Sequence, residues 1–266
     1  MKAIIDTATD FNAVNGWNSG RDEKYDIEGN LESKTATLSD EGEVVYYGEA
    51  KFEGRKATDQ VCFVLSKCLD LEFMYVDKQD ALDDSIGALF GFARPNQGIL
   101  WDSGADSQLM NRAEKMTLSK LSGVGEESIF SFRLRSDLVS WIDIGTPDNN
   151  QNKEEPATFD VNNDFFWSTT MGGVRFGTKG ENAYTFSMME EGAELNGGIY
   201  TIFDTGASDI YLSLLWYEDF VAQLYAATGT EYEIKDGVAT GACTNFPDLY
   251  FLVDNYWWQV KDIDYV

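Results

Sequence analysis

Two segments that lie far apart along the chain share an apolar run leading into Asp-Thr and a small residue. The first reads IIDTA and contains Asp6, and the second reads IFDTG and contains Asp204. An apolar strand that ends at an aspartate can bury the carboxylate beside the chain, and a small residue after the threonine permits a tight turn. One such triplet is common, whereas two copies after matching strands predict a functional pair.

The two carboxyl groups can do acid-base chemistry if the turns that carry them meet. Carboxylates a few Å apart do not both ionise easily, so Asp6 and Asp204 would share one proton and titrate as a unit. The ionised group can take a proton from a bound water while the protonated group gives one to an amide carbonyl. This predicts peptide-bond hydrolysis with both aspartates as catalytic residues. The alternative is that both are ordinary turn formers.

The composition excludes most other routes to this reaction. The chain has no histidine, which rules out serine and cysteine nucleophiles that depend on an imidazole base. Three cysteines, Cys62, Cys68 and Cys243, are too few for a zinc site without histidine. We therefore predict neither a metal nor a cofactor. A disulfide between Cys62 and Cys68 would close a small loop and leave Cys243 free or paired outside this chain.

The net charge of the chain limits the classes of partner that it is expected to bind. The sequence has 20 Lys and Arg residues against 46 Asp and Glu residues, which gives a net charge of −26. This disfavours nucleic acid, whose phosphates are bound by Lys and Arg. Since no run of about 18 apolar residues is present, we also expect no membrane insertion. The many carboxylates indicate either a well-solvated surface or a protein that works in acid, where such groups begin to protonate.

The elements that must position the two aspartates are mostly strands. Short apolar and aromatic runs, separated by Gly, Asp and Asn, predict strands at residues 43–47, 61–65, 129–134, 141–144 and 249–253. Apolar residues recur at helical spacing over residues 214–227, and a shorter helix is expected over 106–121. We therefore predict a mainly β fold with few short helices.

A polar stretch divides the chain. Residues 146–156 read TPDNNQNKEEP and carry a proline near each end, a composition typical of a linker or long loop. Each Asp-Thr motif lies on its own side of this stretch. We predict an N-terminal β lobe over residues 1–147 and a C-terminal β lobe over residues 148–266.

Taken together, these motifs resemble the pepsin-like aspartic protease family over most of the chain. The second motif, at residues 202–208, is similar to the family's second catalytic motif, and residues 2–8 resemble the first. The segment GALFGFARP at residues 87–95 is similar to the family segment that threads under the first aspartate. Residues 129–145 resemble paired strands that close the first lobe, and residues 242–251 resemble a cysteine-then-strand segment of the second.

The resemblance implies two β-barrel-like lobes around a cleft, with Asp6 and Asp204 as the catalytic pair. It further implies that five residues near this pair contact substrate: Thr7, Ala8, Leu38, Thr205 and Gly206.

The sequence also departs from the family pattern. Ala8 replaces the usual glycine of the first motif. An ungapped alignment of residues 35–56 with the family's flap hairpin puts Leu38 and Ser39 where a hydrogen-bonding tyrosine and a glycine are expected, although ordinary strand packing in a chain without a flap is the favoured interpretation of Leu38. Ala13 stands where a tryptophan is expected. We expect both ends to be incomplete relative to the family, with the usual partner of Cys243 in the absent sequence.

Two functions are compatible with these observations. The first is an aspartic endopeptidase that cleaves extended peptides with apolar side chains at the cut. The second is a pseudoprotease that keeps the scaffold as a binding or structural component of an assembly, with protein partners. The altered first motif favours the second function, and the survival of both aspartates favours the first. The possible disulfide and the resemblance suggest a secretory, vacuolar or lysosomal, or extracellular location.

Overall fold

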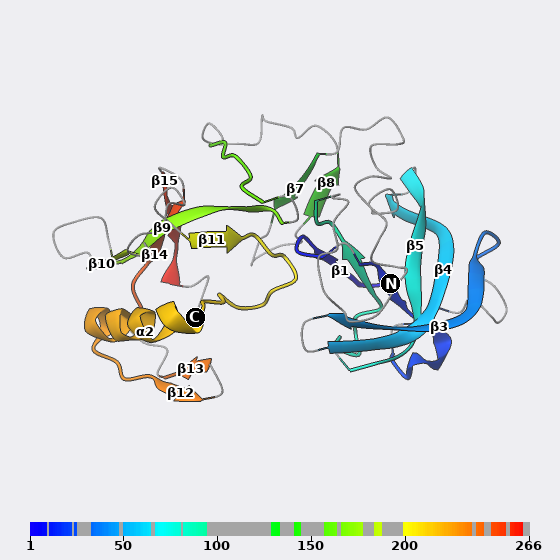
Figure 1. Cartoon of the computed structure of the whole chain (residues 1–266), viewed down its shortest axis with the longest axis horizontal. Helices are drawn as coiled ribbons and strands as arrows, with labels where there is room; N and C mark the ends of the chain where they lie inside the picture. The colour runs from blue at the N-terminus through cyan, green and yellow to red at the C-terminus, as the bar shows by residue number, and fades with distance from the viewer. Residues whose placement is uncertain are drawn as a thin grey trace. The chain divides into compact units, whose positions relative to one another are not determined.

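The chain forms two compact units in the computed structural model (Figure 1). Unit 1 comprises Met1–Ala157, Asp164–Trp167 and Phe203–Gly206, and unit 2 comprises Thr158–Asn163, Ser168–Ile202 and Ala207–Val266. The structure describes residues 1–9, 11–22, 24–25, 33–47, 50–64, 67–80, 82–94, 129–133, 141–144, 157–163, 166–177, 184–187, 199–235, 238–241, 246–253 and 256–262. Two short segments of the C-terminal half thus belong to unit 1, and one of them contains Asp204.

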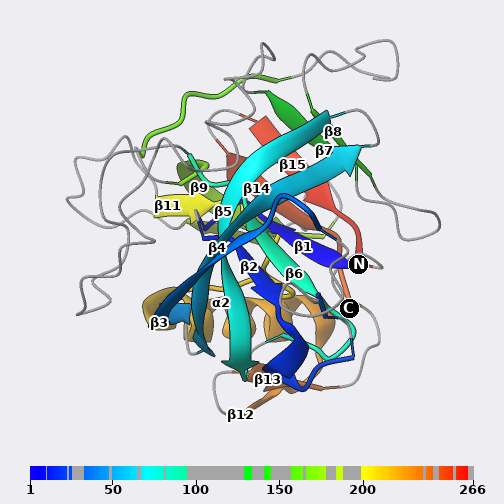
Figure 2. The same cartoon turned by 90° about the vertical axis from the view of Figure 1, so that its right-hand side faces the viewer.

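Unit 1 is built on a six-stranded sheet in the order β1-β6-β2-β5-β4-β3. Its strands are β1 (Ala3–Asp6), β2 (Ala13–Asn15), β3 (Thr37–Tyr47), β4 (Ala50–Val64), β5 (Lys67–Gln79) and β6 (Ala88–Gly91). The three long strands, β3, β4 and β5, form two successive antiparallel hairpins, whereas β1 runs parallel to β6. Figure 2 shows β1, β6 and β2 side by side. A short 3-10 helix, η1 (Trp17–Ser19), follows β2.

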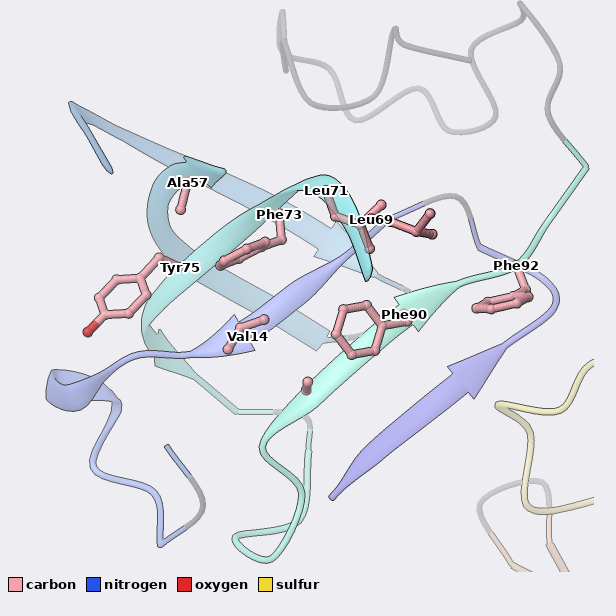
Figure 3. Packing of buried hydrophobic residues seen from close by; sticks show 9 residues of the cluster. Val14, Ala57, Leu69, Leu71, Phe73, Tyr75, Phe90 and Phe92 are labelled. Carbon is pink, nitrogen blue, oxygen red and sulfur yellow. The ribbon is translucent and has the colours of Figure 1, made fainter. Parts of the chain in front are cut away.

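The core of unit 1 lies on both faces of this sheet. One cluster, shown in Figure 3, consists of Val14, Ala57, Leu69, Leu71, Phe73, Tyr75, Ala88, Phe90 and Phe92. A second cluster consists of Phe11, Ala13, Val45, Phe52, Met74, Val76 and Leu89. Successive residues of β5, such as Phe73 and Met74, enter opposite clusters because strand side chains alternate. Burial on both faces explains why this part of β5 reads as a continuous apolar run.

Two further features belong to the described part of unit 1. Strands β7 (Phe130–Arg133) and β8 (Trp141–Ile144) pair antiparallel, with Phe130 opposite Ile144. A disulfide joins Cys62 to Cys68, which are cross-strand neighbours at the end of the β4–β5 hairpin. The sequence predicted this bridge, and it also predicted both paired strands.

Unit 2 is organised around one central strand, β9 (Ser168–Phe176). Strands β10 (Tyr184–Ser187) and β11 (Ile199–Ile202) pair with its two ends on one edge, and β14 (Leu249–Val253) pairs along the other. Strand β15 (Tyr256–Val260) extends the sheet beyond β14. A separate hairpin is formed by β12 (Glu233–Lys235) and β13 (Val238–Thr240).

The helix of unit 2 covers this sheet. Helix α2 (Leu214–Thr228) packs Phe220 against Phe176 and contributes Leu224 to a core with Val174 and Leu249. It ends at Gly229, which has a left-handed φ of 70° and donates its N–H to the carbonyl of Tyr225. The sequence pattern placed this helix correctly.

The mainly β character is therefore confirmed for the described residues. The predicted helix at 106–121, the linker at 146–156 and Cys243 lie outside them, so the division at residue 147 and the arrangement of two lobes around a cleft stay predictions. Within the described ranges, no helix is long and apolar enough to cross a membrane.

Candidate active site

The first aspartate stands at the end of β1 and is fully buried. Strand β6 runs beside β1, with Asp6 opposite Gly91, and the N–H of Phe92 donates to the Asp6 carbonyl at 2.7 Å. Asp6 has an exposed fraction of 0%. The segment LFG at residues 89–91 therefore lies alongside the first aspartate, in agreement with the sequence interpretation.

Each aspartate closes the same small turn with its own carboxylate. The N–H of Ala8 donates to Asp6 Oδ1 at 2.7 Å, and the N–H of Gly206 donates to Asp204 Oδ1 at 2.7 Å. Such local hydrogen bonds from the backbone two residues on are the reason that aspartate is favoured in turns. One oxygen of each carboxyl group is thereby fixed in direction.

The two threonines join the turns reciprocally. Thr7 Oγ1 donates to the carbonyl of Phe203 at 2.6 Å, and Thr205 Oγ1 donates to the carbonyl of Ile5 at 2.6 Å. The backbone N–H of Thr205 donates to Thr7 Oγ1 at 3.0 Å, and that of Thr7 donates to Thr205 Oγ1 at 3.3 Å. Each hydroxyl thus donates once and accepts once, so the two motifs are held together without a buried polar group left unsatisfied.

The carboxyl groups of the two aspartates both lie close to Gly206. A Cβ atom added to Gly206 would lie 2.6 Å from Asp6 Cγ and 3.2 Å from Asp204 Oδ1. The separation of these two atoms cannot exceed the sum of those distances, so the carboxyl groups are near neighbours within unit 1. Asp204 is half-buried, in contrast to Asp6. Paired carboxyl groups at this range can share a proton and orient a water molecule.

The structure brings together six of the seven predicted site residues, and Leu38 belongs elsewhere in unit 1. Leu38 pairs with Ala57 and packs against the cluster around Phe73. The hairpin that contains it closes between Tyr47 and Ala50, far beyond Leu38. A substrate contact by Leu38 stays a prediction.

Sequence reasoning also missed Trp167 and Thr9. The Trp167 indole N–H donates to the carbonyl of Phe92 at 2.8 Å. Thr9 is buried, its Oγ1 accepts the N–H of Phe11, and its carbonyl accepts the N–H of Ala93. A single tryptophan or threonine carries no periodic signal, and only the partners brought by the fold give these two residues their roles.

No three acidic or cysteine side chains of the described ranges are arranged to hold a metal ion. The donor atoms at the site are two carboxyl groups, two hydroxyls and backbone amides. Neighbouring carboxyl groups on Asp-Thr turns are typical of hydrolases that activate water with a shared proton.

Comparison with protein families agrees with this geometry. The model of the eukaryotic aspartyl protease family matches residues 19–266. Because this match covers most of the chain, the protein belongs to the eukaryotic aspartyl protease family, which is pepsin-like. A search of curated proteins found no match. The matched range contains Asp204 but begins after Asp6, so the interpretation of the first motif depends on the hydrogen bonds described above.

Proposed function

We propose that the protein is an aspartic endopeptidase in which Asp6 and Asp204 act as one acid-base pair. The observation that carries this proposal is the reciprocal hydrogen bonding of Thr7 and Thr205, which holds two Asp-Thr turns face to face. A water held by the pair gives a proton to the ionised carboxylate and attacks the peptide carbonyl. The protonated carboxyl group donates to that carbonyl, and later proton transfer to the amine completes cleavage.

The supporting residues have separate roles in this proposal. The N–H groups of Ala8 and Gly206 each bind one carboxylate oxygen and so fix the direction of each acid. Thr7 and Thr205 fix the relative position of the turns.

The substrates of such an enzyme are peptides or unfolded proteins, and family membership supports this class in general. We propose apolar side chains at the cut, cleavage in acid, and a secretory, vacuolar or extracellular location. The disulfide between Cys62 and Cys68 supports an oxidising compartment.

The test is cleavage of an unfolded protein by the purified full chain and its variants. Asp6→Asn and Asp204→Asn keep the shape of the side chain and remove its acid, so each should lower kcat by about a hundredfold to ten-thousandfold between about pH 3 and pH 7. Asp209→Asn is the matched control, because Asp209 is an exposed aspartate near the second motif. A peptide with a tetrahedral hydroxyl group at the cut should inhibit the wild type.

The opposite outcome is equally clear. If a folded wild-type sample leaves the substrate intact at every pH, or if the two variants cleave as fast as Asp209→Asn, the endopeptidase proposal is wrong. Binding of the hydroxyl peptide without cleavage of any substrate would then identify the alternative, a pseudoprotease that recognises extended chains as a protein partner.

A further inference from the structure

The side chain of Trp167 is hydrogen-bonded to the segment that follows β6, the strand that pairs with β1 and Asp6. The carbonyl of Phe92 accepts the Trp167 indole N–H at 2.8 Å. Phe92 in turn donates its backbone N–H to the carbonyl of Asp6 at 2.7 Å. One peptide segment therefore links the indole ring to the residue that carries the first carboxyl group.

The backbone of Trp167 also connects to the second motif. Its carbonyl accepts the N–H of Phe203 at 2.9 Å, and Phe203 directly precedes Asp204. The carbonyl of Phe203 in turn accepts the hydroxyl of Thr7 at 2.6 Å. Four hydrogen bonds thus join Asp6, Phe92, Trp167, Phe203 and Thr7 in a ring, which the peptide bond between Asp6 and Thr7 closes. All five residues belong to unit 1.

The indole ring is held in place by aromatic neighbours. It meets the ring of Phe130 edge to face, with centroids 5.5 Å apart, and Phe130 meets Phe92 in the same way at 5.3 Å. The guanidinium of Arg94 lies 5.9 Å from the centre of the indole ring and is the charged group described against it. Packing from these sides directs the indole N–H toward Phe92, since a fixed ring has few alternative rotamers.

We propose that Trp167 is a positioning residue for the carboxyl pair. Its indole N–H and its carbonyl join the segment that carries Asp204 to the strand that lies under Asp6, and so set the separation of the two acids. The ring packing alone would make Trp167 a core residue. The hydrogen bond from its indole N–H to Phe92 adds a contact that phenylalanine, which has no donor, cannot make. The effect on catalysis rests on the proposed endopeptidase function, while the effect on the carboxyl pair does not.

Two substitutions remove the N–H and keep an aromatic ring. Trp167→Phe is the simple variant, and Trp167→3-benzothienylalanine keeps the size and shape of the indole while replacing N–H by sulfur. Trp17→Phe is the matched control, because Trp17 is 57% exposed. Near-ultraviolet circular dichroism and thermal unfolding establish that each sample is folded.

The kinetic readout separates positioning from packing. Both Trp167 variants should lower kcat by about a hundredfold with KM changed little, because a misplacement of about 1 Å at reacting groups has this effect. Trp17→Phe should match the wild type. The 3-benzothienylalanine variant keeps the ring packing, so an equal loss of kcat in this variant assigns the effect to the indole N–H.

The second readout does not depend on activity. Carbon-13 NMR of the aspartate carboxyl carbons, assigned with Asp6→Asn and Asp204→Asn, follows the titration of the pair in the full chain. A tightly held pair titrates in two well-separated steps, and both Trp167 variants should bring the steps closer together, whereas Trp17→Phe should not. The isosteric variant decides the result if Trp167→Phe fails to fold.

The outcomes distinguish the two proposals. Trp167 variants that titrate and turn over like Trp17→Phe overturn the positioning role, even if the wild type is an active protease. A wild type without activity overturns the endopeptidase function, and the carboxyl titration still tests the role of Trp167.

Discussion

At the scale of single residues, the two carboxyl groups lie so close to Gly206 that there is no room for a side chain at this position. A Cβ atom there would lie 2.6 Å from Asp6 Cγ, well inside van der Waals contact, and 3.2 Å from Asp204 Oδ1. The first motif has a methyl group at the equivalent position, Ala8, and its N–H still binds Asp6. The two motifs therefore differ in how much room each leaves for the opposite acid.

Gly206→Ala should therefore impair catalysis more than folding. We expect the methyl group to displace Asp6 and to lower kcat by about a hundredfold or more. Gly42→Ala is the control, since a Cβ atom there would meet only the carbonyl oxygen of Gly54 at 3.9 Å. Steady-state kinetics and thermal unfolding of both variants make the comparison. Equal kcat values for the two would show that the acids do not crowd Gly206.

The sequence allowed the two acids to be predicted because their motifs repeat, and a repeat is visible without a structure. The position of the hairpin turn could not be predicted in the same way. The β3–β4 pairing shifts register between Leu38 and Gly42, and an ungapped alignment cannot represent such a bulge. The placement of Leu38 at the site depended on that alignment, and its substrate contact stays a prediction.

At the scale of elements, Asp59 of β4 fastens a neighbouring segment to the sheet. Its carboxylate accepts hydrogen bonds from Tyr25 at 2.7 Å, Ser33 at 2.7 Å and Thr35 at 2.6 Å, and from the N–H of Gln60 at 2.7 Å. Burial by itself raises the pKa of Asp59, but the hydrogen bonds from Thr35, Ser33 and Tyr25 outweigh it, and the pKa is lowered.

Asp59→Asn should destabilise the protein in a pH-dependent way. A lowered pKa in the folded state means that the charged form adds stability above the ordinary aspartate value of about 3.9, and that this stability is lost as the pH falls through the folded-state pKa. We expect a loss of about 1–3 kcal/mol near neutral pH that shrinks in strong acid.

Urea unfolding at several pH values measures this difference. Asp70→Asn is the control, because Asp70 is an exposed aspartate of β5 opposite Gln60. A penalty for Asp59→Asn that stays constant down to about pH 2 would contradict a role for the ionised carboxylate.

The elements that could be predicted are those whose sequence signal lies within one short segment. Strands β8 and β14 coincide with the predicted runs, since their apolar residues are contiguous. The order of strands could not be predicted from composition, because β1 pairs with β6 far along the chain. The second motif also differs from expectation: β11 ends at Ile202, and Ile202 and Phe203 are 44% and 48% exposed. Strand β11 pairs with β9 alone among the described strands, so it buries less than a central strand would.

At the scale of the whole molecule, the excess of carboxylates is the dominant electrostatic feature. The 46 acidic residues outnumber the 20 basic ones by 26, so most carboxylates have no basic partner of their own even if every Lys and Arg forms an ion pair. The ion pairs that the structure describes, such as Arg55 with Asp77 and Lys56 with Glu72, lie within unit 1. Self-repulsion among the remaining carboxylates opposes the folded state near neutral pH.

Salt should therefore stabilise the protein near pH 7. Raising NaCl from about 0.05 M to about 0.5 M shortens the Debye length severalfold and screens the repulsion, so the melting temperature should rise. The increase should be smaller near pH 4, where many carboxylates are protonated. Differential scanning calorimetry at both pH values measures the effect. A melting temperature that falls with salt at pH 7 would mean that attractive pairs dominate.

The crossed threonine contacts also govern when the site can exist during synthesis. They join residues separated by 196 to 200 positions in the chain, so a ribosome releases the first motif long before its counterpart has been translated. A nascent or prematurely terminated polypeptide holds one acid without the other and has no completed centre. In the proposed enzyme, peptide cleavage therefore cannot begin before the second motif, at residues 202–208, has been synthesised.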